Sequence, residues 1–266
     1  MQRTSRNLPE IDFAERQRRH YDRVAEAYAA NLGYPHTQEY MRYLDAEFLA
    51  LMPPGRLGTV VELCCGTGEA YARVAQKADF AVGLDVSFEM LKRARRLHPE
   101  FRVVQGDATR LPMREGFADA VIIHGGIHHV PNRLDLFREI RRILRPGGRL
   151  YFHEPVDDFW LWRAIRSIVY RLSPGLDHLT EEPLRKARTA AELREAGLRP
   201  VDWNTRGLIG FCLFMNSDIL IFNRAFQFMP GIRAITRFAC RVDDWMVRRN
   251  GLKGCGLIAL GSAERL

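Results

Sequence analysis

The chain has 266 residues, of which 47% are hydrophobic and 27% charged, enough to bury one sizeable core. Its formal net charge of +8 and pI of about 9.5 favour an anionic partner, but charge alone does not distinguish nucleic acid, a membrane surface and an acidic metabolite. The five cysteines show neither a disulfide framework nor Cys-x-x-Cys metal spacing, so we expect reduced thiols and a cytoplasmic protein. The charged first residues predict neither a secretory signal nor a transmembrane span.

Two helices are predicted before the first strand. Residues 13–32 form an amphipathic pattern, and residues 37–51 form a second helical pattern. Within the first helix, residues 20–28 carry aromatic side chains at helical spacing, which is typical of packing against a core. A Pro-Pro-Gly sequence at 53–55 then interrupts the helical pattern and leads into an apolar run.

Residues 59–70 read Thr-Val-Val-Glu-Leu-Cys-Cys-Gly-Thr-Gly-Glu-Ala and predict a strand, a tight turn and a helix start. The first five residues are apolar except for Glu62, as expected for a parallel strand buried on both faces. Gly66 and Gly68 have no side chain to hold a ligand away from the backbone, and the helix predicted at 69–77 presents its N-terminus to the turn. We therefore predict a ligand crevice here, with Glu62 facing it.

The glycine pattern separates this turn from two common nucleotide sites. A dinucleotide fingerprint needs a third glycine where this chain has Tyr71, and no Gly-Lys-Ser/Thr sequence of a Walker loop follows. The turn instead resembles motif I of the class I S-adenosylmethionine-dependent methyltransferases. The residues on this pattern are Glu62, Gly66, Thr67 and Gly68. Cys64 departs from it, because the family usually has its first glycine there, and this leaves the conformation of the loop open.

A second apolar strand is predicted from Phe80 to Asp85. Its final acid follows the glycine turn by about twenty residues, the spacing of a ribose-binding acid in nucleoside sites. A carboxylate accepts charge-assisted hydrogen bonds from both hydroxyls of a vicinal diol, so we predict that Asp85 binds the ribose. The alternative is that Asp85 or Ser87 caps the helix predicted at 88–96.

The third strand is predicted at 101–107 and ends in Asp107. The resemblance implies that this carboxylate accepts a hydrogen bond from the adenine amine, while the amide of Ala108 donates one to the ring. A turn-forming aspartate is the alternative. Acids at three successive strand ends, Glu62, Asp85 and Asp107, are a more specific signal than any one of them.

A fourth strand is predicted at 117–123, followed by the exit His-Gly-Gly-Ile-His-His-Val at 124–130. A helix at 133–144 ends in Arg-Pro-Gly-Gly, and a fifth strand follows at 149–153. This block is similar to the family's Asp-x-Val, Leu-His-His-Val and Glu-Ile-x-Arg-x-Leu-x-Pro-Gly-Gly motifs. The resemblance therefore extends over residues 60–155.

Histidines cluster at the ends of the fourth and fifth predicted strands. They are His124, His128, His129 and His153. A metal site could use an i, i+4 pair, but no acidic ligand pattern accompanies them, so we expect no metal. His124 lies where residues of the family lie beside the methyl donor, and we predict that it orients the acceptor or removes its proton. A histidine satisfied by the loop backbone is the alternative, and Glu154 is a second candidate base.

The resemblance implies S-adenosylmethionine as cofactor and a set of residues around it. It also makes the segment 20–28 similar to the Phe-Asp-x-x-Ala-x-x-Tyr segment that small-molecule methyltransferases fold over the cofactor; an ordinary packing helix is the alternative. The cofactor-binding residues that we predict are Tyr28, Glu62, Cys64, Gly66, Thr67, Gly68, Asp85, Val86, Met90, Asp107, Ala108, His124, Gly125 and His129.

The predicted fold is a single α/β domain with a Rossmann-like, mostly parallel seven-stranded sheet and helices on both faces. The family implies the strand order 3-2-1-4-5-7-6, with strands six and seven at 200–206 and 254–262. The predicted parts are an N-terminal helical cap at 1–52, a cofactor-binding core at 53–158, a helical lid or insertion at 159–253 that includes strand six, and a last strand within 254–266.

The predicted function is methyl transfer from S-adenosylmethionine to an oxygen, carbon or nitrogen of a small, lipophilic acceptor. A non-catalytic, partner-activating protein is one alternative, and an RNA methyltransferase is another, although no Asn-Pro-Pro-Tyr-type motif or RNA-binding appendage is present. Self-association is left open.

Apolar side chains in the insertion motivate the lipophilic acceptor and a peripheral contact with the membrane. They are Phe211, Leu213, Phe214, Met215, Ile219, Leu220, Ile221, Phe222, Phe226, Phe228 and Met229, with Trp160, Trp162 and Tyr170 in the helix predicted at 159–172. A second small core is the alternative use of these residues.

Overall fold

The computed structural model describes residues 15–19, 22, 33–164, 182–215, 221–249 and 252–266. One seven-stranded sheet lies at its centre in the order β3-β2-β1-β4-β5-β7-β6, as predicted. The strands are β1 (Gly58–Leu63), β2 (Ala78–Asp85), β3 (Arg102–Gln105), β4 (Ala118–His124), β5 (Leu144–Pro155), β6 (Leu198–Arg206) and β7 (Ile258–Arg265). β7 runs antiparallel to its neighbours β5 and β6, and the other strand pairs are parallel. The predicted fold class is therefore confirmed.

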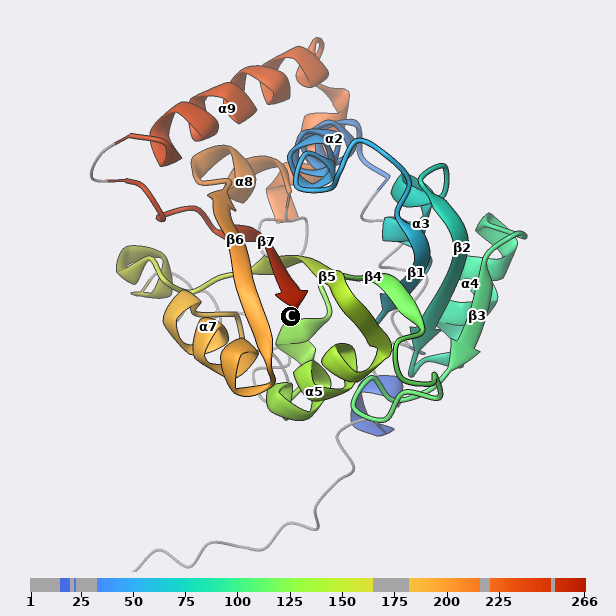
Figure 1. Ribbon diagram of the computed structural model, residues 1–266. Helices are drawn as coiled ribbons and strands as arrows, with labels where there is room; N and C mark the ends of the chain where they lie inside the picture. Colours follow the sequence, from blue (N-terminus) through green and yellow to red (C-terminus); the bar gives the residue numbers. More distant parts are fainter. Residues whose placement is uncertain (1–14, 20–21, 23–32, 165–181, 216–220, 250–251) are drawn as a thin grey trace, which may run out of the picture.

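Helices cover both faces of this sheet (Figure 1). On one face lie α5 (Arg133–Ile143) and α7 (Lys186–Glu195), and on the other lie α2 (Pro35–Leu49), α3 (Glu69–Val74), α8 (Ile209–Phe214) and α9 (Ile232–Val247). α4 (Phe88–Leu97) packs on β2 and β3 near the edge of the sheet. Two 3₁₀ segments, η1 (Ile127–His129) and η2 (Ile221–Phe228), complete the set of named elements.

Alternating side chains of the central strands form two cores. Val61 and Ile123 point toward α5 and α7, whereas the intervening Val60 and Ile122 point toward α2 and α3. Because successive residues of a strand face opposite sides, a continuous apolar run supplies both cores at once. Burying each such side chain contributes about 1.5–3 kcal/mol, which explains why these runs become the centre of the sheet.

A buried carboxylate holds the segment between β6 and β7 against α2. Asp243 of α9 is 1% exposed and accepts hydrogen bonds from the amides of Leu208, Gly210 and Phe211 at the start of α8. The hydroxyl of Tyr40 on α2 donates to the same carboxylate at 2.6 Å. These bonds satisfy amides that a helix start leaves unpaired, and they join α2, α8 and α9 into one unit.

Many apolar residues predicted for the lid are part of a third core. Tyr40, Leu44, Phe214, Ile232 and Cys240 form its buried centre. Partly buried residues that pack against them include Phe211, Leu213, Met215 and Phe226. For these residues the structure shows the second small core that was the alternative interpretation. Trp162 also packs inward, against Val247 and Leu257, whereas Trp160 is exposed; Tyr170, Ile219 and Leu220 lie outside the described residues.

Element ends differ from the predictions where tertiary contacts decide them. α3 ends at Val74 rather than 77, because the carbonyl of Lys77 accepts a hydrogen bond from Leu57 and turns the chain into β2. β3 ends at Gln105, since Asp107 folds back onto Thr109. β7 begins at Ile258 rather than 254, after a turn that includes Gly254 at φ 88°.

Other ends lie earlier than predicted. α2 begins at Pro35, since a proline fits the first turn of a helix. β5 begins at Leu144 because the pairing with β4 shifts register between Ala118 and Ala120 and admits the Arg-Pro-Gly-Gly sequence as an irregular strand start. The helix predicted at 13–32 is helical at 15–19 and 22, and the one predicted at 159–172 is helical at 160–164; their other residues lie outside the described part.

Candidate active site

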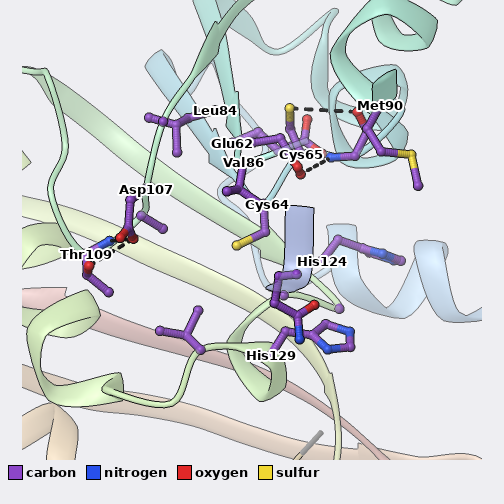
Figure 2. Close-up of a pocket in the computed structure, with 18 of the residues that line it drawn as sticks. Glu62, Cys64, Cys65, Leu84, Val86, Met90, Asp107, Thr109, His124 and His129 are labelled. Carbon is purple, nitrogen blue, oxygen red and sulfur yellow. Dashed lines mark hydrogen bonds between the residues drawn. The ribbon is translucent and has the colours of Figure 1, made fainter. Parts of the chain in front are cut away.

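A cavity of about 280 Å³ lies at the carboxyl ends of β1, β2 and β4. Most of the predicted site residues line it: Glu62, Cys64, Gly66, Asp85, Val86, Met90, Asp107, Ala108, His124, Gly125 and His129. Figure 2 shows Asp107 and Thr109 on one side of this cavity, His124 and His129 on another, and Cys64 between them. Thr67 and Gly68 belong to the same turn but do not line the cavity, and Tyr28 lies outside the described residues.

The turn after β1 uses left-handed backbone conformations. Cys64, Gly66 and Gly68 have φ angles of 52°, 50° and 84°. Nothing lies within 4 Å of a Cβ placed on Gly66, so this glycine leaves space open beside the cavity. A Cβ on Gly68 would lie 3.0 Å from His98 and 3.2 Å from Phe101, so Gly68 permits close packing. Cys64 takes a conformation that costs a non-glycine residue free energy, at the position where the family usually has glycine.

Glu62 holds the first turn of α3 through hydrogen bonds to its backbone. Its carboxylate accepts hydrogen bonds from the amide of Ala70 at 3.1 Å and of Tyr71 at 2.8 Å. The side chain is 3% exposed, and burial raises the pKa of Glu62 to about 8 although the amides oppose this shift. Glu62 therefore holds the helix start and also places a weakly acidic carboxyl group in the cavity wall.

Asp85 joins the turn after β1 to the turn after β2. Its two carboxylate oxygens accept hydrogen bonds from the amides of Gly66 and Ser87, each at 2.8 Å. Burial raises the pKa of Asp85 above its usual value. The helix cap that was the alternative role is provided by Ser87, whose hydroxyl accepts from the amide of Met90 at 3.2 Å. Asp85 lines the cavity, and its contact with a ribose stays a prediction.

Asp107 combines a turn-forming contact with a place in the cavity wall. Its Oδ1 atom accepts hydrogen bonds from the amide and the hydroxyl of Thr109, both at 2.8 Å. Among the described residues, its Oδ2 atom has no hydrogen-bond donor. The turn that was the alternative reading is therefore present, and it leaves one carboxylate oxygen for a ligand in the cavity.

His124, which is partly buried, pairs with the buried His153 on the neighbouring strand. The Nε2 atom of His124 lies 2.5 Å from the Nδ1 atom of His153, because parallel β4 and β5 place the two residues in register. The ring of Phe48 on α2 packs edge-on against His124 and tilted against His153. Burial lowers the pKa of His124 well below its usual value and that of His153 to about 3, so both imidazoles are neutral at pH 7.

Glu154 lies behind the cavity and organises the loop after β4. Its Oε1 atom accepts hydrogen bonds from the amides of Gly126 and Ile127, both at 2.7 Å, and its Oε2 atom lies 2.7 Å from Nδ1 of His128. The side chain is fully buried, which raises the pKa of Glu154 to about 7. It does not line the cavity, so its position suits a residue that holds the loop better than one that reaches an acceptor.

Two N-terminal residues extend the site beyond the predicted set. Gln17 lines the cavity and is 7% exposed, and its Oε1 atom has no hydrogen-bond partner among the described residues. Asp22 accepts hydrogen bonds from the hydroxyl of Ser87 at 2.6 Å and the amide of Glu89 at 3.3 Å. The resemblance of segment 20–28 indicated that the N-terminal region covers the site, but no spacing rule singled out either residue.

The polar groups of the cavity fit the parts of S-adenosylmethionine. Asp85 and Asp107 supply carboxylate acceptors for hydroxyl and amine donors, and Glu62 supplies a carboxyl group that ionises beside a cation. The unpartnered amide oxygen of Gln17 supplies a further acceptor. Within the described ranges, no group of three or more His, Cys, Asp and Glu side chains could hold a metal ion.

Comparisons with known proteins identify the family of the chain. Residues 61–152 match a family model described as a methyltransferase domain. The demethylmenaquinone methyltransferase of Beutenbergia cavernae is 33% identical over 167 residues, 57% of this chain and 69% of that protein. The chain belongs to the class I S-adenosylmethionine-dependent methyltransferases. The demethylmenaquinone methyltransferase of Mycolicibacterium vanbaalenii is 32% identical over 188 residues, which cover 64% of this chain and 79% of that protein.

The solved structures show the same methyltransferase fold. A methyltransferase from Thermotoga maritima superposes with a TM-score of 0.63 and 16% sequence identity, covering 94% of this chain and 99% of that one. Membership of the family makes the chain an enzyme and S-adenosylmethionine its cofactor, as predicted. In the described part of the methyltransferase, no helix combines the length and apolar character needed to cross a bilayer.

Proposed function

We propose that this methyltransferase acts on a small, lipophilic acceptor that carries an ionisable hydroxyl or an activated ring carbon, as a quinol does. The observation that carries the proposal is the neutral His124–His153 pair at the cavity wall. A neutral imidazole can take a proton from an uncharged acceptor, whereas a protonated one cannot. The names of the relatives from Beutenbergia cavernae and Mycolicibacterium vanbaalenii, both demethylmenaquinone methyltransferases, support the quinol class.

The cofactor supplies an electrophilic methyl group on a positively charged sulfur, and the chain supplies binding, orientation and a proton acceptor. Asp85 and Asp107 hold the nucleoside through their carboxylates. Glu62 and the turn around Gly66 hold the amino acid end. Gln17 reduces the access of water to the cavity.

We assign to His124 the role of the base that takes a proton from the methyl acceptor. Phe48 and His153 fix the orientation of its ring, and Glu154 fixes the loop that follows it. With S-adenosylmethionine bound, the cofactor would supply the methyl group and keep the electron pair of its carbon–sulfur bond, and His124 would take the acceptor's proton and become an imidazolium. Glu69 lies near enough to stabilise this charge, since its Oε2 atom is 4.0 Å from Nδ1 of His124.

The test is methyl transfer from labelled S-adenosylmethionine to acceptors of different polarity. We expect label in 2-polyprenyl naphthoquinols dispersed in detergent, and none in RNA or in polar amines. Label in RNA would replace this proposal by the RNA alternative. Cofactor binding without transfer to any acceptor or cell extract would favour the non-catalytic alternative. A lipophilic acceptor also supports the expected peripheral contact with a membrane, because such a molecule partitions into the bilayer.

A further inference from the structure

The outermost helix, α9, has two apolar faces. One face, which includes Ile232, Cys240 and Val247, is buried against the rest of the protein. Ile235, Phe238 and Trp245 are 43%, 67% and 57% exposed and recur at i, i+3 and i+10, a spacing that places them on one side of a helix, opposite the buried face. A helix that only packs against a core needs one apolar face, so the second face indicates a partner.

The exposed apolar face continues into the segment before α9. Phe228 is 81% exposed and Met229 is 43% exposed, immediately before the turn at Gly231 that starts the helix. Single exposed apolar residues are common on protein surfaces. A set of three large aromatic rings and two aliphatic side chains along one helix and its N-terminal approach is not explained in that way. Together we call Phe228, Met229, Ile235, Phe238 and Trp245 the α9 face.

Arginines outnumber acidic residues in the segment that carries the α9 face, and three of these arginines are paired: Arg233 and Arg237 with Glu39, and Arg248 with Asp244 and Glu47. Residues 221–249 contain six arginines: Arg224, Arg233, Arg237, Arg241, Arg248 and Arg249. Their acidic residues are Asp243, which is 1% exposed, and Asp244, which is partly buried. Arg224 and Arg241 are exposed and form no ion pair within the described residues, and Arg249 stacks over the ring of Trp245 at 4.3 Å. The surface is therefore apolar, aromatic and cationic at once.

We propose that the α9 face docks on the surface of an anionic lipid bilayer. Aromatic rings and apolar side chains enter the boundary between headgroups and acyl chains, while arginines bind lipid phosphates and other anionic headgroup oxygens. Charge complementarity selects this partner over a second copy of the chain, because two cationic α9 faces repel each other. No helix of the described part could insert across the bilayer, so the contact is interfacial.

The α9 helix is linked to His124 through α2. α9 packs on α2 and α8 (Figure 1), and the same α2 places Phe48 against His124 and His153. Docking through α9 would therefore hold α2, which carries Phe48, near the bilayer in which a lipophilic acceptor dissolves. The connection between docking and the lipophilic acceptor deepens the proposed function and rests on it. The lipid contact itself rests on the exposed residues alone.

Flotation of the full chain with vesicles tests the docking. We expect it to float with vesicles of phosphatidylglycerol and phosphatidylcholine at low salt, less at high salt, and little with phosphatidylcholine alone. Phe238→Ser should weaken binding about tenfold, and Arg241→Glu by about fivefold or more at low salt. Phe88→Ser is the matched control, because Phe88 is a 54% exposed aromatic beside Lys92 on α4, at the other end of the sheet.

The outcomes separate lipid docking from the alternatives. If the wild-type chain floats with no vesicle, or if Phe238→Ser floats as well as Phe88→Ser, the proposal is wrong. A dimer that Phe238→Ser converts to monomer, without flotation, would assign the α9 face to self-association instead. Melting curves establish that each variant is folded. Methylation of a detergent-dispersed acceptor tests the proposed function separately: a chain that floats but methylates no lipophilic acceptor keeps the lipid contact and loses that function.

Discussion

The Nε2 atom of His124 lies 2.5 Å from the Nδ1 atom of His153, and the two rings share the ring of Phe48 as a neighbour. At this distance one nitrogen carries a proton and the other accepts it. If His153 donates from Nδ1, its Nε2 is an acceptor, and this atom is buried with no hydrogen-bond partner among the described residues. His124 then carries its own proton on Nδ1, toward Glu69. In the other arrangement His124 donates from Nε2 and its Nδ1 atom is free of a proton, so only this arrangement lets His124 take a proton from the methyl acceptor, and His153 controls which arrangement forms.

The first prediction concerns turnover. His124→Ala should lower kcat by about 10²- to 10⁴-fold, the usual contribution of a general base, while the Kd for S-adenosylmethionine changes little. His153→Phe should lower kcat less, because it removes the orienting partner but leaves His124 in place. Steady-state kinetics and calorimetry measure the two quantities. Full activity of both variants would mean that acceptor alignment alone carries the reaction.

The second prediction concerns the charge of the pair. An ordinary histidine gains a proton as pH falls through about 6.5, but burial lowers the pKa of His124 well below that value and that of His153 to about 3. His153 should therefore stay neutral in the folded enzyme between pH 8 and pH 5, and His124 should gain a proton only well below pH 6.5. Histidine ring NMR, assigned with His124→Ala and His153→Phe, measures this directly. A titration of either ring near pH 6.5 would contradict the buried pair.

The lowered pKa values of His124 and His153 also predict how the free energy of unfolding changes with pH. The unfolded chain takes up protons on these histidines below about pH 6.5, and the folded chain does not. Their contribution to the free energy of unfolding is therefore present above that pH and is lost as pH falls below it. The double variant His124→Phe/His153→Phe should lose less stability than the wild type between pH 7 and pH 5 in urea titrations.

The third prediction links cofactor binding to a proton. Burial raises the pKa of Glu62 to about 8, so its carboxyl group is mostly protonated in the free enzyme at pH 7. A cationic cofactor in the cavity favours the carboxylate, so binding should release a fraction of a proton per molecule, and affinity should rise with pH toward 8. Calorimetry in buffers of different ionisation enthalpy measures this release. Glu62→Gln should bind the cofactor without this proton release. Equal binding enthalpies for the wild type in all buffers would refute the prediction.

The fourth prediction concerns Asp85. Asp85→Ala removes a charged acceptor from the cavity wall and should weaken cofactor binding by about 1.5–3 kcal/mol, or roughly 10- to 100-fold. It also removes the acceptor of the Gly66 and Ser87 amides, so the melting temperature should fall. Glu89→Gln is the control, because Glu89 is a carboxylate of the neighbouring helix that does not line the cavity. An unchanged affinity of Asp85→Ala would remove Asp85 from the cofactor site.

Much of this fold could be predicted because its signals are local. A strand buried on both faces is apolar at every position, and Val60 and Val61 show this in the sequence and in the two cores. The ends of elements could not be predicted as well, since they depend on distant contacts such as that of Leu57 with Lys77. A one-residue change in hydrogen bonding moves an end without changing the pattern.

Some residues of the candidate site could be predicted from the sequence, and others could not. Asp85 and Asp107 stand at strand ends, and parallel strands bring such ends to one edge of the sheet. The pairing of His124 with His153 depends on the register of β4 and β5, which the sequence does not encode in a simple spacing. Gln17 reaches the cavity from the N-terminal part of the chain, and only the folded chain shows which residue of that helix faces the cavity.

The contact of Asp22 with Ser87 has a consequence for the timing of the catalytic cycle. The amide of Ser87 donates to Asp85 and its hydroxyl donates to Asp22, so Ser87 connects the cavity wall at Asp85 to the N-terminal part of the chain. We expect a ligand in contact with Gln17 to exchange with solvent when Gln17 leaves the cavity wall, and the hydrogen bonds of Asp22 to oppose that movement. We therefore expect the release of the spent cofactor to depend on the lifetime of these two hydrogen bonds, in a step that is separate from the transfer of the methyl group.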